Sequence, residues 1–221
     1  MYGFVTLVGV RPHRKHITAD SPAWQPVGVT PEELSDVCAV VLCGGEGRRF
    51  GGDKTAADLG GIPVLDALLT TLPPEWAVRC VGPERPTRRD GVTWVREDPP
   101  GGGPVAGVAA GVAGTRASVT VLLGGDMPYA APAAARLASH LWSSPDTDAV
   151  VGVDGHGHVQ PLLAAYRTEA LRAALPPAPE GTPLKRLLDS LRIVVDPVPA
   201  QASLDVDTPE DLEAARHRLG P

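Results

Sequence analysis

A glycine-rich loop that carries cations follows the apolar stretch at residues 37–42. Residues 40–54 read VVLCGGEGRRFGGDK, so an apolar run leads into glycines, then Arg48 and Arg49, and finally Asp53 and Lys54. Glycine lets the backbone turn sharply and bring its N–H groups close to an anion, and nearby cations neutralise the charge held there. A loop of this composition directly after a strand is most simply built to hold a nucleoside triphosphate.

Three phosphate-loop patterns compete for this segment. The dinucleotide pattern G-x-G-x-x-G fails, because Phe50 stands where the third glycine belongs. The Walker A pattern comes closer, since Gly47 and Gly52 have its spacing, but Asp53 intrudes before Lys54. The best match is L-A-G-G-x-x-x-R-x-G-(x)-D-K, the opening motif of nucleotidyltransferases of the molybdenum cofactor guanylyltransferase family, which LCGGEGRRFGGDK resembles.

Composition narrows the class of protein. The 221 residues allow one sizeable domain with a full core, with or without an extension. A formal net charge of −6 argues against a general nucleic-acid binder, so local cations must attract an anionic substrate. No apolar stretch approaches the roughly 18–20 residues of a membrane span, and the apolar start precedes its basic cluster, the reverse of a signal peptide. We therefore expect a cytoplasmic protein without a membrane partner.

Strand-like and helix-like patterns alternate from residue 37 onward, whereas residues 1–36 show no clear period. We therefore expect an N-terminal extension of unknown role at 1–36 and one nucleotidyltransferase domain at 37–221. Alternation predicts an α/β fold of Rossmann-like type, with a mostly parallel central sheet and helices on both faces. Strands are expected at 37–42, 77–82, 92–96, 118–123, 148–153, 159–165 and 192–196, and helices at 63–71, 105–113, 131–142, 168–175, 182–190 and 208–218.

A second segment of interest follows the predicted strand at 92–96. Its sequence, EDPPGGGPVAG, resembles the D…G-P-L-A-G segment of the same family. Glycines such as Gly103 let a planar base or a ribose lie against the backbone. Asp98 has the chemistry to accept hydrogen bonds from a guanine edge or a ribose. Without the resemblance, the same residues would fit a glycine-rich surface loop.

A third segment, VLLGGDMP, is a buried strand that ends on the carboxylate of Asp126. A hard oxygen ligand facing a polyphosphate suits Mg²⁺, which takes few protein ligands and shares the phosphates. An ordinary turn begun by aspartate would explain these residues equally well on their own. By the family resemblance, Asp126 is the magnesium ligand.

The fourth segment, LDVDTP at 204–209, resembles the family's N-x-N-T-P with aspartates in place of asparagines. In extended chain Asp205 and Asp207 lie on one face. We take Asp207 as a second candidate metal ligand, although extra carboxylates strengthen metal binding and also repel phosphate. The other interpretation is that Asp207 supports the N-terminus of the last helix, where negative charge is favourable.

The resemblance covers about residues 37–219 and implies an enzyme that transfers GMP from GTP to the terminal phosphate of molybdopterin, releasing pyrophosphate. It implies that Arg49 and Lys54 neutralise the phosphates and that Asp126 holds Mg²⁺. GTP and molybdopterin are the implied partners, together with a protein that delivers molybdopterin. The implied nucleotide-binding residues are Leu42, Cys43, Gly44, Gly45, Lys54, Asp98, Gly103 and Asp126.

Three other interpretations stay open. A related nucleotidyltransferase that uses CTP, or another phosphorylated acceptor, can also carry D-x-D-T-P. A P-loop GTPase or GTP-binding adaptor would use the near-Walker loop, with VLLGGD as its second motif, but must tolerate Asp53 before Lys54. A degenerate homologue would bind the nucleotide without transferring it, and Val81-Gly82-Pro83 lacks the asparagine that some members of the family use there.

Overall fold

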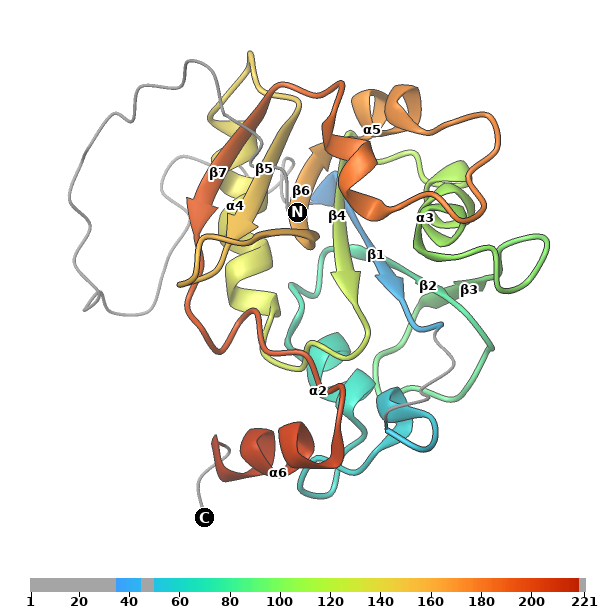
Figure 1. Cartoon of the computed structure of the whole chain (residues 1–221), viewed down its shortest axis with the longest axis vertical. Coiled ribbons are helices and arrows are strands. Elements are labelled where there is room, and N and C mark those ends of the chain that lie inside the picture. Colours follow the sequence, from blue (N-terminus) through green and yellow to red (C-terminus); the bar gives the residue numbers. More distant parts are fainter. Residues whose placement is uncertain (1–34, 45–49, 219–221) are drawn as a thin grey trace, which may run out of the picture.

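A computed structural model describes residues 35–44 and 50–218 of the chain. These residues form an α/β fold around one sheet of seven strands, in the order β3-β2-β1-β4-β6-β5-β7 (Figure 1). The strands are β1 (Val37–Leu42), β2 (Ala77–Val81), β3 (Val92–Val95), β4 (Val119–Gly124), β5 (Ala149–Val153), β6 (Val159–Arg167) and β7 (Ile193–Pro197).

Every strand except β6 runs in the same direction. β1 pairs in parallel with β2 and β4, β2 with β3, and β5 with β7, whereas β6 is antiparallel to both β4 and β5. The predicted mostly parallel sheet is therefore confirmed. The carboxyl ends of six strands meet at one edge, which we call the carboxyl edge, and their starts meet at the opposite amino edge.

Apolar side chains on both faces of the central strands explain why helices cover the sheet on two sides. In β1, Val37, Ala39 and Val41 pack with α2 and α4, whereas Cys38 and Val40 pack with α3, α5 and the short η2. Burial of both faces gives central parallel strands their continuous apolar sequences. The helices are η1 (Lys54–Ala56), α2 (Val64–Thr71), α3 (Pro104–Ala113), α4 (Ala131–Trp142), α5 (Thr168–Ala174), η2 (Leu184–Leu188) and α6 (Pro209–Arg218).

The segment predicted as a helix at 182–190 differs from expectation. It forms only a five-residue 3-10 turn, η2, which begins after Pro183 and buries a single leucine, Leu187. Gly181, with φ of 67°, donates its N–H to the carbonyl of Gly102, so the chain before η2 is held against another loop. The backbone hydrogen bonds of the segment join residues three apart, as from Arg186 N–H to the carbonyl of Pro183, which is the 3-10 pattern. Across residues 35–44 and 50–218, no helix combines the length and apolarity needed to cross a bilayer.

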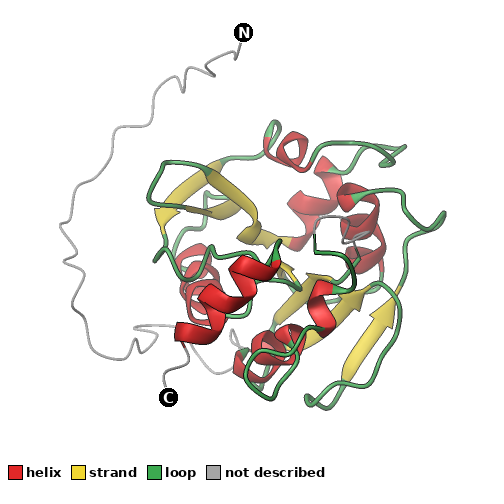
Figure 2. Ribbon diagram, turned by 60° about the horizontal axis from the view of Figure 1, so that its bottom comes forward, coloured by secondary structure: helices red, strands yellow, loops and turns green. Residues whose placement is uncertain are grey.

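Helix α6 lies beyond the carboxyl edge, below the arrowheads of β1 and β4 in Figure 1. It packs Leu212 and Ala215 with Val206, Leu59 and Val64 in a small separate apolar cluster. Figure 2 brings this end of the molecule forward and shows loops and helices gathered in front of the strand ends. The last helix therefore closes the side of the sheet at which open parallel sheets bind ligands.

Candidate active site

A lysine and two aspartates from three separate segments meet at the carboxyl edge. The ammonium of Lys54, at the start of η1, forms ion pairs with Asp126, just after β4, and with Asp207, just before α6. The Lys54 and Asp126 side chains are about four-fifths covered, and that of Asp207 is half exposed. We call these three residues the Lys54 cluster. The sequence analysis predicted a phosphate role for Lys54 and a metal role for both aspartates, and the structure brings all three together.

Backbone contacts explain how segments 80 residues apart come to share this cluster. The N–H of Val206 donates to the carbonyl of Asp126 at 3.0 Å, which joins the chain before α6 to the end of β4. Next to it, Asp211 accepts from the N–H groups of Asp207 and Thr208 at 3.2 and 2.8 Å, and Thr208 Oγ1 accepts from Asp211 N–H. This reciprocal capping fixes the backbone that carries the Asp207 carboxylate.

Glycines at the end of β4 provide the room for Asp126. A Cβ on Gly124 would collide with Asp126 Oδ1, and one on Gly125 would lie 3.1 Å from the carbonyl oxygen of Leu42. The N–H of Gly125 donates to that carbonyl at 2.9 Å. The pair Gly-Gly before Asp126 thus lets β4 run close beside β1 while the carboxylate turns back towards the strand end.

The charges of the cluster influence one another strongly. Burial works against the charge of Lys54, but its hydrogen bonds to Asp126 and Asp207 outweigh burial and raise its pKa. The Asp205 residue is exposed as a whole, but local desolvation of its carboxyl, followed by the negative charges of Asp126 and Asp207, raises its pKa to about 7. The carboxylates of Asp126 and Asp207 outnumber the single ammonium of Lys54.

A second group of side chains holds the residues on either side of Lys54. Asp53 Oδ1 accepts from the N–H and the hydroxyl of Thr55 at 3.0 and 2.7 Å. Arg85 Nη1, from the loop after β2, donates to Asp53 Oδ2 at 2.5 Å and to Thr55 Oγ1 at 2.9 Å. The Arg85 guanidinium carbon lies 5.8 Å from the centre of the Trp94 ring. We call Asp53, Thr55, Arg85 and Trp94 the Arg85 clamp.

Arg85 was not singled out from the sequence. The available signal was a cation three residues after a predicted strand end, at the edge where the glycine-rich loop also ends. Partial burial works against the charge of Asp53, but the Thr55 hydrogen bonds and the Arg85 cation outweigh it and hold the pKa of Asp53 below its usual value. Asp53, which interrupts the Walker-like pattern, thus forms an ion pair with Arg85.

The remaining predicted residues of the first loop are placed as follows. Leu42 ends β1, and Cys43 is buried and donates its N–H to the carbonyl of Val81 at 2.8 Å. Gly44 is exposed, and a Cβ built on it would meet nothing within 4 Å. Gly45 and Arg49 lie outside the described residues.

Asp98 and Gly103 lie on the connection between β3 and α3. Asp98 is exposed, and Gly103 stands at the N-cap of α3 with φ of 93°, a conformation that suits glycine. In the described part of the chain, no ion pair or side-chain hydrogen bond joins Asp98 to the Lys54 cluster. Their role at the nucleotide stays a prediction.

Two further observations bear on the choice of site. Within the described ranges, no group of three or more His, Cys, Asp or Glu side chains is arranged to hold a metal ion, since Lys54 stands between Asp126 and Asp207. A cavity of about 410 Å³ opens at the amino edge, lined by residues 35–38, 77–79 and 114–117. It lacks the paired charges of the carboxyl edge, which we therefore take as the candidate site.

The comparison with known protein families decides the family. The model of the MobA-like NTP transferase domain matches residues 39–195. The chain belongs to the MobA-like NTP transferase family. It is accordingly a nucleotidyltransferase, and membership decides against the P-loop GTPase interpretation.

Individual members agree with this assignment. A protein of Natronomonas pharaonis named probable molybdenum cofactor guanylyltransferase is 30% identical over 205 residues, covering 84% of this chain and 100% of that protein. The fold matches the molybdopterin-guanine dinucleotide biosynthesis protein A of Archaeoglobus fulgidus with a TM-score of 0.63 at 24% identity, covering 82% of this chain and 98% of that one. It also matches the 2-C-methyl-D-erythritol 4-phosphate cytidylyltransferase of Thermus thermophilus, with a TM-score of 0.61, 18% identity and coverage of 81% and 97%.

Proposed function

We propose that the protein transfers GMP from GTP to the terminal phosphate of molybdopterin and releases pyrophosphate. The observation that carries this proposal is the Lys54 cluster. This chain is a nucleotidyltransferase by family. At the carboxyl edge of its sheet, Lys54, which ends the glycine-rich loop, pairs with two carboxylates. The names of its relatives supply the guanylyl group and the molybdenum cofactor as the substrates to test. A protein that delivers molybdopterin is part of the same proposal.

The proposed transfer depends on neutralisation of negative charge and does not depend on proton transfer by the protein. The attacking phosphate of the acceptor is already ionised at neutral pH, so no general base is required. Catalysis then depends on holding the two substrates in line and on neutralising negative charge as the α-phosphorus is attacked. We assign Lys54 and Arg49 to the phosphates of the nucleotide. In this account Lys54 exchanges its carboxylate partners for phosphate oxygens when the nucleotide binds.

The donor set at the carboxyl edge fits Mg²⁺. Asp126 and Asp207 are hard oxygen ligands, and together with Asp205 they supply more negative charge than Lys54 offsets. Once Lys54 turns to the phosphates, both carboxylates are free to share a cation with the nucleotide. When bound, Mg²⁺ supplies neutralisation of the phosphate charge. We therefore propose Asp126 and Asp207 as its protein ligands.

The base and ribose are assigned to the backbone around two glycine segments. Leu42, Cys43, Gly44 and Gly45 form the end of β1 and the start of the loop; Leu42 O and Cys43 N–H are already paired with neighbouring strands, so the exposed Gly44 is the first described residue open to a ligand. The loop that carries Asp98 and Gly103 provides the second side. This placement leaves the choice of base to backbone groups, with Asp98 as the side-chain acceptor.

CTP is the one competing nucleotide that a specific observation favours. The chain has DVDTP at 205–209, with aspartates where the guanylyl family has asparagines. By the family resemblance, relatives that act with CTP can also carry this D-x-D-T-P pattern. A cytidylyltransferase that uses a different phosphorylated acceptor is therefore the alternative to be tested.

The test is a calorimetric titration of GTP, CTP and ATP into the full chain, with and without Mg²⁺. The proposal predicts Mg²⁺-dependent binding of GTP, weaker binding of the other two, and weakened but measurable GTP binding in Lys54→Ala. Preference for CTP would move the protein to the cytidylyl alternative. Binding of none of the three, also with molybdopterin present, would identify a degenerate homologue and contradict the proposal.

A further inference from the structure

Lys54 is flanked on both sides by residues that bond to one arginine. Asp53 and Thr55, its immediate neighbours, bond to each other, and both accept from Arg85 Nη1 at 2.5 and 2.9 Å. Thr55 is 5% exposed, so its hydroxyl, which donates to Asp53 and accepts from Arg85, satisfies its hydrogen bonds away from solvent. The backbone of Lys54 is thus held at two adjacent points.

Arg85 is itself held from a different part of the sheet. It lies on the connection between β2 and β3, its side chain is 20% exposed, and its guanidinium lies against the ring of Trp94 in β3. Arginine presents a planar fork that stacks on an aromatic ring while bonding a carboxylate, which lysine does not reproduce. Trp94, Arg85 and Asp53 therefore join the β3 side of the sheet to the N-cap of η1.

The two clusters meet at Lys54 and act on different atoms of it. The Arg85 clamp holds the main chain around Lys54, whereas Asp126 and Asp207 hold its ammonium. Such a short element, three residues of 3-10 helix, has little intrinsic rigidity of its own. An error of about 1 Å in a group that contacts phosphate costs up to roughly a hundredfold in rate.

We propose that Arg85 is a positioning residue for the proposed nucleotidyl transfer, acting through Asp53 and Thr55 to place Lys54 for the phosphates. Arg85 does not contact the nucleotide in this account. The inference rests on the proposed function for its effect on activity, but its effect on Lys54 itself is independent of the substrate.

The binding test is a double-mutant cycle of Arg85→Ala and Lys54→Ala, read as GTP affinity in Mg²⁺ by calorimetry. We expect Arg85→Ala to weaken GTP binding about tenfold in the wild-type background and less than twofold in the Lys54→Ala background, since residues that act as a unit are not additive. The matched control is Arg88→Ala on the same loop, whose exposed guanidinium donates to the carbonyl of Gly61 and which should bind GTP as wild type does. Equal losses in both backgrounds would mean that Arg85 contacts the nucleotide itself and would overturn the inference.

A second readout does not depend on GTP. The chain has only three lysines, Lys15, Lys54 and Lys185, so side-chain NMR of lysine labelled with ¹³C at Cε resolves Lys54, assigned by its loss in Lys54→Ala. Arg85→Ala should move the Lys54 signal towards that of free lysine and leave the other two unchanged. An unmoved signal would overturn the inference whether or not GTP binds. Should Arg85→Ala fail to fold, Arg85→Met keeps the contact with Trp94 without the charge and gives the same two readouts.

If wild type binds no GTP but the Lys54 signal moves in Arg85→Ala, the proposed function fails and the positioning of Lys54 stands. If wild type binds GTP, Lys54→Ala binds it more weakly, and Arg85→Ala matches wild type in both readouts, the positioning inference alone fails. The two outcomes are therefore separate.

Discussion

The two edges of the sheet use charged residues of the same types in different ways. At the carboxyl edge, Lys54 pairs with Asp126 and Asp207, and Arg85 with Asp53, so these two cations bond to carboxylates of other segments. At the amino edge, Arg192 pairs with Asp148, but three other arginines bond mainly to backbone carbonyls. Arg167 donates to those of Thr147, Leu141 and Ser144, Arg172 to those of Val112 and Thr115, and Arg79 to that of Gly111.

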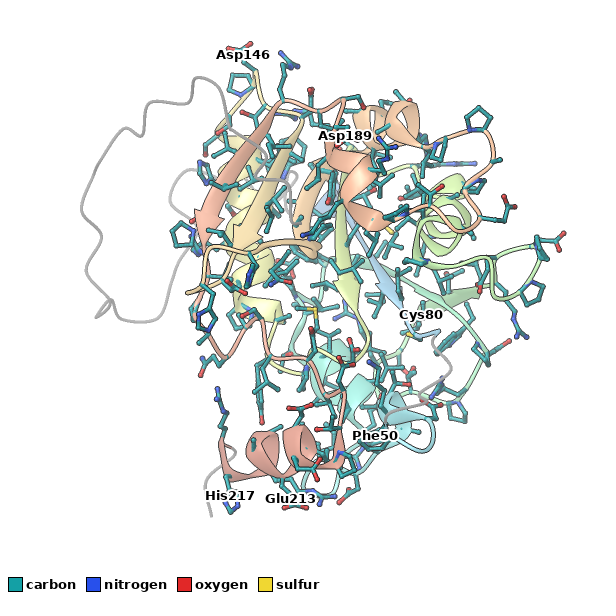
Figure 3. The ribbon with its side chains drawn as sticks, in the orientation of Figure 1. Phe50, Cys80, Asp146, Asp189, Glu213 and His217 are labelled. Carbon is teal, nitrogen blue, oxygen red and sulfur yellow. The ribbon has the colours of Figure 1, made fainter. Side chains whose placement is uncertain are left out.

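The connection between β2 and β3 carries one arginine of each kind. Arg85, near the end of β2, belongs to the clamp beside Lys54, whereas Arg89, just before β3, donates to five carbonyls around the end of α2. Figure 3 shows the two ends apart, with Phe50 and Glu213 at one and Asp146 and Asp189 at the other. Cations that close helix ends serve stability, because those carbonyls lack partners within the helix. A cation held by carboxylates of other segments, as Lys54 is, can exchange them for the oxygens of a bound anion, which is what a binding site requires.

The largest effect is expected at the carboxyl edge, where two substitutions should lower activity without lowering stability. Lys54→Ala and Asp126→Ala should each lower the rate of nucleotidyl transfer about 10²–10³-fold, because each removes a charge directed at the reacting phosphates. Both should fold as wild type does, as judged by circular dichroism and thermal unfolding. A variant that kept more than a tenth of wild-type pyrophosphate release would show that the role assigned to that residue is wrong.

Arg89→Ala, at the amino edge, should lower the stability of the fold and leave the transfer activity nearly unchanged. Removal of a charged donor from several partly buried carbonyls costs about 2–3 kcal/mol in the free energy of unfolding. In a chain of this size the Tm should fall by roughly 5–10 °C, while the activity per folded molecule stays within about twofold. Arg88→Ala is the matched control and should leave the Tm almost unchanged. A loss of activity without a loss of stability would break the division between the edges.

Gly124→Ala tests the position of Asp126 at the carboxyl edge by adding one methyl group beside it. The new Cβ would occupy the place of Asp126 Oδ1, and the flexible carboxylate can turn away at little cost in stability. We expect about a tenfold loss of transfer, near 1.4 kcal/mol, as Asp126 leaves the Lys54 cluster. Gly155→Ala, at a glycine with open space around its Cβ, is the control. Unchanged activity in Gly124→Ala, with the Tm also unchanged, would mean that the position of Asp126 is not critical.

The smallest effect concerns the pH dependence of stability. The pKa of Asp205 is raised from its ordinary value of 3.8 to about 7 in the folded protein, so the folded state binds this proton more tightly than the unfolded chain does. Its favourable contribution is therefore complete below about pH 4 and is lost as the pH rises through 7. In metal-free buffer at pH 8, Asp205→Asn should raise the Tm by roughly 2–4 °C, about 1 kcal/mol after allowance for solvent screening of an exposed residue.

That gain should fall to roughly two-fifths at pH 5, where unfolded Asp205 is already ionised, and approach zero only below about pH 4. The exposed Glu210→Gln in α6 is the control and should show no such dependence on pH. A gain that is equal at pH 5 and pH 8 would show that charge repulsion at Asp205 is not its cause.

The fold was largely predictable from the sequence, because its central strands are buried on both faces. β1 and β4 read as continuous apolar runs, and the structure places them within one residue of the predicted bounds. The prediction of an α-helix at 182–190 was wrong, because the backbone hydrogen bonds of this segment join residues three apart and form a 3-10 turn. Asp205 and Asp207 were expected in extended chain and lie in a loop outside the strands.

The site was predictable where a pattern in the sequence marks it. Lys54, Asp126 and Asp207 were named from their motifs, but the sequence does not show that Lys54 bridges two carboxylates, one of them 153 residues away. Arg85 lies in no motif that we recognised, and its partner Asp53 is 32 residues distant. Asp98 and Gly103 stay predictions, and Gly45 and Arg49 fall outside the described residues. Motifs thus identify reacting groups, whereas residues that support them become visible only as contacts.

The central claim is that the carboxyl edge of the sheet performs guanylyl transfer. The most direct measurement incubates the full chain with GTP, Mg²⁺ and molybdopterin and follows pyrophosphate by a coupled assay and the pterin by mass spectrometry. The account predicts molybdopterin guanine dinucleotide and pyrophosphate in equal amounts, both lost in Lys54→Ala and both retained in Arg89→Ala at a temperature where it is folded. Release of GDP and phosphate, or the same products from Lys54→Ala at the wild-type rate, would contradict it.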